Sequence, residues 1–144
     1  MKKILIALVA ILMVLPVMLA ACGKSEKTLE DIKKAGTITM ATCSGFEPFE
    51  ILGTDGKVTG VDVDIAQAIA DYLGVKLEIA DVDFDSIVPG VQSGKFDLGV
   101  AGITANDARR KNVDFSADYY TASQAIIVLS TNTTITSAED VKKL

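Results

Sequence analysis

The chain has 144 residues, enough for one domain, and its 14 Lys and Arg against 19 Asp and Glu give a net charge of −5. An acidic balance argues against a nucleic-acid-binding protein, which needs a basic surface. The sequence contains no histidine, so a zinc site of the His/Cys type is not expected and a cysteine nucleophile would lack an activating base. We expect neither a metal nor a cofactor.

The N-terminus has the layout of a secretory signal peptide over residues 1–21. Two lysines precede an apolar run, residues 4–17, and small residues follow it. The sequence "LAAC", which ends at Cys22, resembles the bacterial lipobox, in which this cysteine carries lipid and becomes the new N-terminus. We expect residues 22–36 to be the lipidated cysteine and a polar tether, held on the membrane by two acyl chains. The alternative is a retained spanning helix, because the apolar run just reaches the necessary length.

The elements that follow alternate between strands and helices. In chain order we expect a strand at 37–42, a hairpin turning at Asp55–Gly56, a helix at 60–74, a strand at 75–80, a helix at 83–94, a strand at 96–102, a helix within 105–113 and a strand at 124–130. This order predicts an α/β fold with a parallel sheet. If the strand order is second-first-third, the loops 43–50 and 101–109 flank the point where ligands bind in such sheets.

Two arginines occupy an unusual place at the start of the last of these helices. Asn106 is a typical helix cap, and Arg109 and Arg110 follow it, although the positive end of the helix dipole disfavours cations. Arg109 is explained if it holds an external carboxylate with two parallel hydrogen bonds. The equal alternative is an ion pair with a surface carboxylate such as Asp107 or Asp114.

Other residues of the two loops could complete a binding site. Thr104 offers a hydroxyl and an N–H group, and Gly102 allows a ligand to approach the backbone closely. Phe46 is expected to line a cleft, whereas Phe49 is expected to fill the core and Phe84 fits either place.

The acidic residues at the helix starts have a simpler interpretation. Asp62 and Asp64 begin the helix at 60–74 and are expected to cap it rather than to serve as a catalytic or metal-binding pair. A second acidic group lacks the glycine and glutamate of a calcium loop and is also interpreted as helix-start acids: Asp81, Asp83 and Asp85.

Residues 37–130 resemble the family 3 solute-binding proteins of bacterial ABC importers, which mostly bind polar amino acids. The family signature is seen as "GVDVDIAQAIADYL", residues 60–73, with Val61 where a larger apolar residue is usual. "FEPFE", "DFDSIVPGVQSGKFDLGVAGIT" and "VDFSADYY" also match the family, in the same order. The resemblance implies a type II periplasmic-binding-protein-like fold of two α/β lobes, with the ligand in the cleft between them.

The resemblance also implies roles for individual residues. Arg109 matches the arginine that clamps the ligand α-carboxylate, and Thr104 matches the residue that donates its N–H and hydroxyl to the same group. Gly102 matches the position whose carbonyl takes the α-ammonium. Phe46 and Phe84 match aromatic residues that sandwich the ligand.

Cys43 departs from the family pattern, because many members carry a polar or acidic residue there, facing the ligand side chain. This argues mildly against a strongly cationic ligand such as arginine. We expect residues 37–123 to form the first lobe, and residues 124–144 a hinge strand and the start of a truncated second lobe. With only one lobe, the fragment is expected to bind amino acids weakly or not at all.

The implied function is that of a monomeric, lipid-anchored receptor on the extracytoplasmic face of the cell membrane. It would bind a polar amino acid and deliver it to an ABC transporter permease, without catalysis. One alternative is an enzyme similar to cyclohexadienyl dehydratases, in which Glu47 or Glu50 would be the acid-base group. Another is an extracellular amino-acid sensor module.

Overall fold

The computed structural model describes residues 27–143, which form two compact units, one ending at Asp114 and one beginning at Phe115. The predicted signal peptide and Cys22 lie outside the described residues. Within residues 27–143 no helix is both long and apolar enough to cross a membrane.

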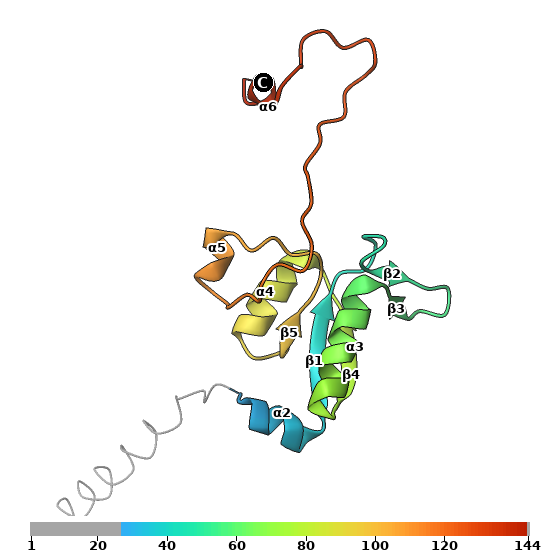
Figure 1. The fold of residues 1–144 in the computed structure, drawn as a ribbon, viewed down its shortest axis with the longest axis vertical. Coiled ribbons are helices and arrows are strands. Elements are labelled where there is room, and N and C mark those ends of the chain that lie inside the picture. Colours follow the sequence, from blue (N-terminus) through green and yellow to red (C-terminus); the bar gives the residue numbers. More distant parts are fainter. Residues whose placement is uncertain (1–26, 144) are drawn as a thin grey trace, which may run out of the picture. The chain divides into compact units, whose positions relative to one another are not determined.

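The first unit is built on a three-stranded parallel sheet. Strand β1 (Thr37–Thr42) lies in the centre, between β4 (Lys76–Asp81) and β5 (Leu98–Gly99), so that the order is β4-β1-β5 (Figure 1). This confirms the predicted second-first-third order. β5 is shorter than the predicted strand at 96–102, because its ladder with β1 covers only two residue pairs.

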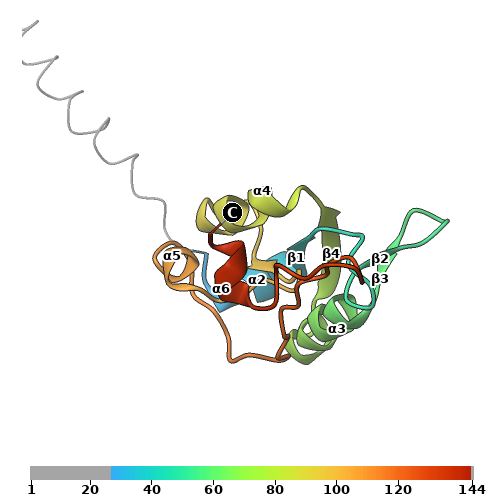
Figure 2. The same ribbon diagram turned by 90° about the horizontal axis from the view of Figure 1, so that it is seen from above.

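Two helices cover opposite faces of this sheet, α3 (Val61–Leu73) and α4 (Phe84–Gln92), as Figure 2 shows. Strand side chains alternate between the faces. Ile38 of β1 accordingly belongs to a core cluster with Ala70 of α3, and Ala41 belongs to another cluster with Ile87 of α4. The sheet therefore has an apolar core on each side.

Glycines fix both ends of α3. As predicted, Gly74 ends the helix in the left-handed conformation, with φ +70°. At the start, Gly60 has φ +125°, and a Cβ there would overlap the Phe49 carbonyl oxygen. The first helical N–H groups donate to the Pro48 and Phe49 carbonyls, so that α3 begins directly on the loop that follows β1.

The predicted hairpin is present as β2 (Ile51–Leu52) and β3 (Val58–Thr59), which pair antiparallel. The expected helix within 105–113 is the single turn α5 (Asp107–Arg110). Its predicted cap is confirmed, because the Asn106 side chain accepts the Arg109 N–H.

The prediction of a polar tether at residues 22–36 was wrong for the second half of this range, which forms helix α2 (Leu29–Ala35). Thr28 and Asp31 form a reciprocal capping box at its start, and Ile32 is buried in the core cluster of Ile38. The Lys27 ammonium also lies 2.7 Å from the Asp97 carboxylate. This stretch is therefore part of the fold.

The second unit contains one short helix, α6 (Ala138–Val141), with a capping box between Ser137 and Asp140. The predicted strand at 124–130 is not formed, since residues 115–136 contain neither helix nor strand. A strand needs partners for its backbone groups, and the described residues of this unit supply none. The first unit also ends before residue 123, where the first lobe was predicted to end.

Candidate ligand-binding site

The loops that follow β1 and β5 leave the same end of the sheet, because the strands are parallel. They carry the residues predicted to bind a ligand. The start of α4, which follows β4, lies at this end as well. The structure thus places the predicted loops at the carboxyl ends of adjacent strands, where α/β folds bind ligands.

Arg109 is held in place by three contacts. Its backbone N–H donates to the Asn106 side-chain oxygen at 2.9 Å, and its Nη1 donates to the Thr104 carbonyl at 2.9 Å. Its Cζ atom lies 5.2 Å from the centre of the Phe84 ring, a cation–π contact between α5 and α4. The last two contacts fix a long, flexible side chain in one direction.

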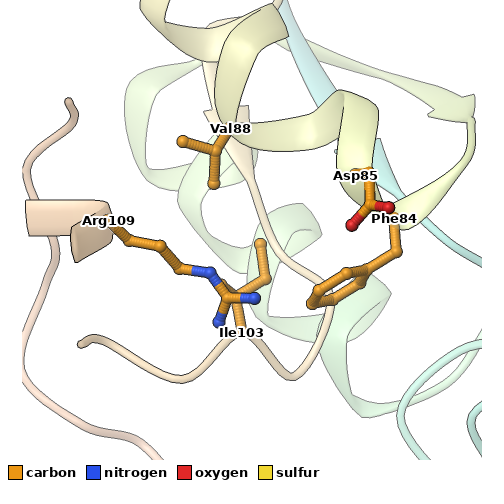
Figure 3. Close-up of a pocket in the computed structure, with 5 residues that line it drawn as sticks. All are labelled: Phe84, Asp85, Val88, Ile103 and Arg109. Carbon is orange, nitrogen blue, oxygen red and sulfur yellow. The ribbon is translucent and has the colours of Figure 1, made fainter.

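The guanidinium lines a small pocket of the first unit together with Phe84, Asp85, Val88 and Ile103. Figure 3 shows the Arg109 side chain extending from its helix turn toward the Phe84 ring. In the described part of the chain, Arg109 forms no ion pair with a carboxylate, so the predicted alternative with Asp107 or Asp114 is not adopted. Since a guanidinium has five N–H donors, most of them remain available.

The pocket lining includes residues that the sequence did not single out for binding. Asp85 was interpreted only as a helix-start acid, yet its residue lines the pocket in the first turn of α4. Val88 and Ile103 add the apolar wall. The helical spacing of Phe84 and Val88, four residues apart on one face, was a signal that could have found the latter.

Phe46 lies at the surface of the other loop and is 57% exposed; it is not among the residues that line the pocket. It stacks on the half-buried Phe49 ring, with 5.4 Å between ring centres. Its edge covers Gly102, where an added Cβ would lie 3.1 Å from the ring. Gly102 has φ +53°, so both its conformation and its neighbour favour glycine.

Asp62 does not cap α3, and that prediction was wrong. Its side chain is fully buried, and Oδ2 accepts the Gly102 N–H at 2.8 Å. The N-cap residue is Gly60, and no side chain forms a capping hydrogen bond there. Asp62 therefore connects the start of α3 to the loop after β5, a contact across 40 residues of sequence. Asp64 remains exposed.

Glu50 is also fully buried, close to Asp62. Burial, together with the hydrogen bond and the charge of Asp62, raises the pKa of its carboxyl to about 8. No N–H or hydroxyl donor of the described residues reaches either oxygen of Glu50. This pair of neighbouring buried carboxyls was not anticipated from the sequence.

Cys43 and Asp81 contribute to packing and hydrogen bonding around the start of the loop that follows β1. Cys43 is a free, half-buried thiol that packs against the core cluster containing Ala41 and Ile87. Asp81 accepts from the Ser44 N–H and hydroxyl at 2.8 and 2.6 Å, so it orders the loop after β1. No group of His, Cys, Asp and Glu in residues 27–143 is arranged to hold a metal ion.

Curated relatives that match the chain include amino-acid-binding proteins. The arginine-binding extracellular protein ArtP of Bacillus subtilis is 38% identical over 99% of this chain and 53% of its own length. The L-cystine-binding protein TcyJ of Escherichia coli is 32% identical over 81% of this chain and 44% of its own length. The chain thus spans about half the length of these relatives.

Solved structures show the same fold. The arginine-bound form of domain 1 from TmArgBP is 38% identical, with a TM-score of 0.61 over 62% of this chain and 71% of that one. The ancestral amino acid-binding protein AncCDT-1, a precursor of cyclohexadienyl dehydratase, is 41% identical, with a TM-score of 0.62 over 65% and 42%. In the first of these proteins a single domain is found with arginine bound.

The family model for bacterial extracellular solute-binding proteins, family 3, matches residues 38–144. This range contains every residue of the pocket, both buried carboxyls and the two loops at the carboxyl ends of the strands. The predicted resemblance is confirmed, and with it the α/β fold of a periplasmic-binding-protein lobe. The chain belongs to the bacterial extracellular solute-binding proteins, family 3.

Proposed function

We propose that the chain binds a polar amino acid through the ligand α-carboxylate, which the Arg109 guanidinium holds. The observation that carries the proposal is the fixed position of this guanidinium, between the Thr104 carbonyl and the Phe84 ring, without a carboxylate of the described residues as its partner. A guanidinium binds a carboxylate with two parallel hydrogen bonds, which sets orientation as well as affinity. The exposed Thr104 would donate its hydroxyl and N–H to the same group.

The other predicted site residues would contact the rest of the ligand. The exposed Phe46 and the partly exposed Phe84 would contact its apolar part, and the carbonyl of Gly102 would accept from its ammonium group. Cys43 would face its side chain. Asp85 adds a carboxylate to the pocket lining that could take a second cationic group, which weakens the argument from Cys43 against arginine.

A single lobe is sufficient for this proposal. The structure of domain 1 of TmArgBP is an arginine-bound form, which counts against the expectation that one lobe binds weakly or not at all. We therefore expect measurable binding by this chain. Its relatives are named for arginine and for cystine, so these two amino acids are the first probes.

The cellular part of the proposal rests on the N-terminal sequence and the family. We propose that Cys22 is lipidated, that the monomeric protein is held on the extracytoplasmic face of the cell membrane, and that it delivers its ligand to an ABC transporter permease. Mass spectrometry of the protein purified from membranes would show the acylated N-terminus. Replacement of Cys22 by Ala should release the protein from the membrane fraction.

An enzymatic role has one supporting observation, since the cyclohexadienyl dehydratase of Pseudomonas aeruginosa is 30% identical over 69% of this chain. Of the two glutamates considered for acid-base chemistry, Glu50 is fully buried, so a bound ligand would not reach it. Glu47 is exposed. Incubation with prephenate or arogenate, followed by product analysis, tests this alternative, and we expect no product.

Calorimetry with L-arginine and with L-cystine tests the proposed function. Replacement of Arg109 by Ala should weaken binding by at least about tenfold, because a charge-assisted hydrogen bond is lost. The matched control is Arg110→Ala, whose exposed side chain is adjacent in sequence and should leave the affinity nearly unchanged. Equal effects of the two substitutions would contradict the assignment of Arg109.

A further inference from the structure

A pair of buried carboxyl groups has no part in the proposed ligand contacts. Glu50 and Asp62 are both 0% exposed, and they are among the largest fully buried side chains of the described residues. A buried carboxyl is costly unless it is neutral or bound by donors. No group of residues 27–143 that could hold a metal ion includes either residue.

Each member of the pair is attached to one of the two ligand loops. The carbonyl of Glu50 accepts the N–H groups of Gly45 and Phe46 at 2.9 and 3.1 Å, which closes the loop that presents Phe46. The side chain of Asp62 accepts the Gly102 N–H at 2.8 Å, which fixes the loop leading to Thr104. The hydrogen bond between the two carboxyls thus links the two ligand loops.

The chemistry of the pair requires one proton. Two ionised carboxylates that are buried close together repel strongly. Burial, the hydrogen bond with Asp62 and the charge of Asp62 raise the pKa of Glu50 to about 8, so at neutral pH the proton resides on Glu50, whose carboxyl O–H donates a hydrogen bond to the Asp62 carboxyl. The groups facing Glu50 are consistent with this arrangement, because among the described residues Asp62 supplies the charge that acts on it and no lysine or arginine contributes.

We propose that Glu50 and Asp62 are positioning residues, which share a proton and hold the Phe46 loop and the Gly102 backbone in the geometry that accepts the ligand. The inference rests on the proposed function of amino-acid binding. When Glu50 loses its proton, repulsion separates the two carboxyls and loosens the contact between Asp62 and Gly102. Ligand affinity then falls, although neither residue touches the ligand.

Calorimetry with L-arginine, and with L-cystine as a second probe, tests this at about pH 6.5 and about pH 8.5, on either side of the Glu50 pKa of about 8. The wild type should lose at least about threefold in affinity over this interval relative to Glu50→Gln, which cannot ionise. Titration of the ligand itself affects both proteins equally and cancels. NMR of the Glu50 side-chain carboxyl carbon, without ligand, should show a titration in the same interval.

Substitutions of Asp62 test the second half of the link. Asp62→Ala leaves the Gly102 N–H without its acceptor and should weaken binding by about tenfold at about pH 6.5. Asp62→Asn keeps an acceptor oxygen and should restore most of the affinity. The matched control, Asp64→Asn, changes an exposed acid of the same helical turn and should have no effect.

The outcomes separate this inference from the proposed function. A wild type that binds neither probe overturns the proposed function, whatever the carboxyl titration shows. If the wild type binds and Asp62→Ala binds equally well, only the inference is overturned. The same holds if the wild type binds and Glu50→Gln shows the same pH dependence of affinity. If Asp62→Ala fails to fold by circular dichroism, the comparison of the wild type with Glu50→Gln decides the question alone.

Discussion

The stability of the first unit should depend on pH through Glu50, and Glu50→Gln should remove this dependence. An ordinary glutamate ionises near pH 4.5, whereas the buried carboxyl has a pKa of about 8. Between these values the folded state holds a proton that the unfolded chain has released. The stability linked to this proton is complete below pH 4.5 and is lost as the pH rises through 8.

The size of this pH dependence follows from the one proton that the folded state retains on Glu50. From about pH 6 to about pH 8 the free energy of unfolding should fall by about 2 kcal/mol more in the wild type than in Glu50→Gln. Urea denaturation followed by circular dichroism at the two pH values measures the difference. Glu47→Gln is the control, because Glu47 is an exposed glutamate of the same loop and should leave the wild-type dependence intact. The reasoning is refuted if Glu50→Gln keeps the wild-type slope.

Three further substitutions test the packing of the first unit, each by urea denaturation. Gly60→Ala should destabilise the protein by roughly 2 kcal/mol or more, since φ is +125° and a Cβ would overlap the Phe49 carbonyl; an unchanged midpoint would contradict the tight start of α3. Ile87→Ala should cost about 2–5 kcal/mol, because the side chain is fully buried between α4 and the sheet, and a loss below about 1 kcal/mol would count against this core. Thr28→Ala should cost about 1 kcal/mol through loss of the capping box with Asp31, whereas no change would show that α2 is not needed for the fold.

The order of the sheet could be predicted from the sequence because the necessary signals are local. The strand at 37–42, the helix that ends at Gly74 and the strand that follows are each recognisable from spacing and a terminal glycine. A parallel pair joined by a helix restricts the topology to few arrangements. Arg109 was identified in the same way, since a cation at a helix start conflicts with the dipole.

The failed predictions depended on contacts between distant residues. Asp62 follows the local rule for helix-start acids, but its acceptor role is determined by Gly102, 40 residues later. The apolar run at 124–130 has the composition of a strand, yet a strand also needs a partner. The missed helix α2 is different, because the Thr28 and Asp31 spacing was visible in the sequence and was interpreted as a tether.

The first described residues contact the sheet at the amino ends of its strands, opposite the end that carries the binding loops. Lys27 reaches Asp97, which also accepts the Thr39 N–H at 2.8 Å, near the beginning of β1. The loop carrying Phe46 leaves from the far end of the same strand, three residues and about 10 Å beyond Thr39. A mechanical pull on the chain ahead of Lys27 is therefore transmitted first to the amino edge of the sheet. The point at which the described chain enters the fold and the ligand loops thus lie at opposite ends of the central strand.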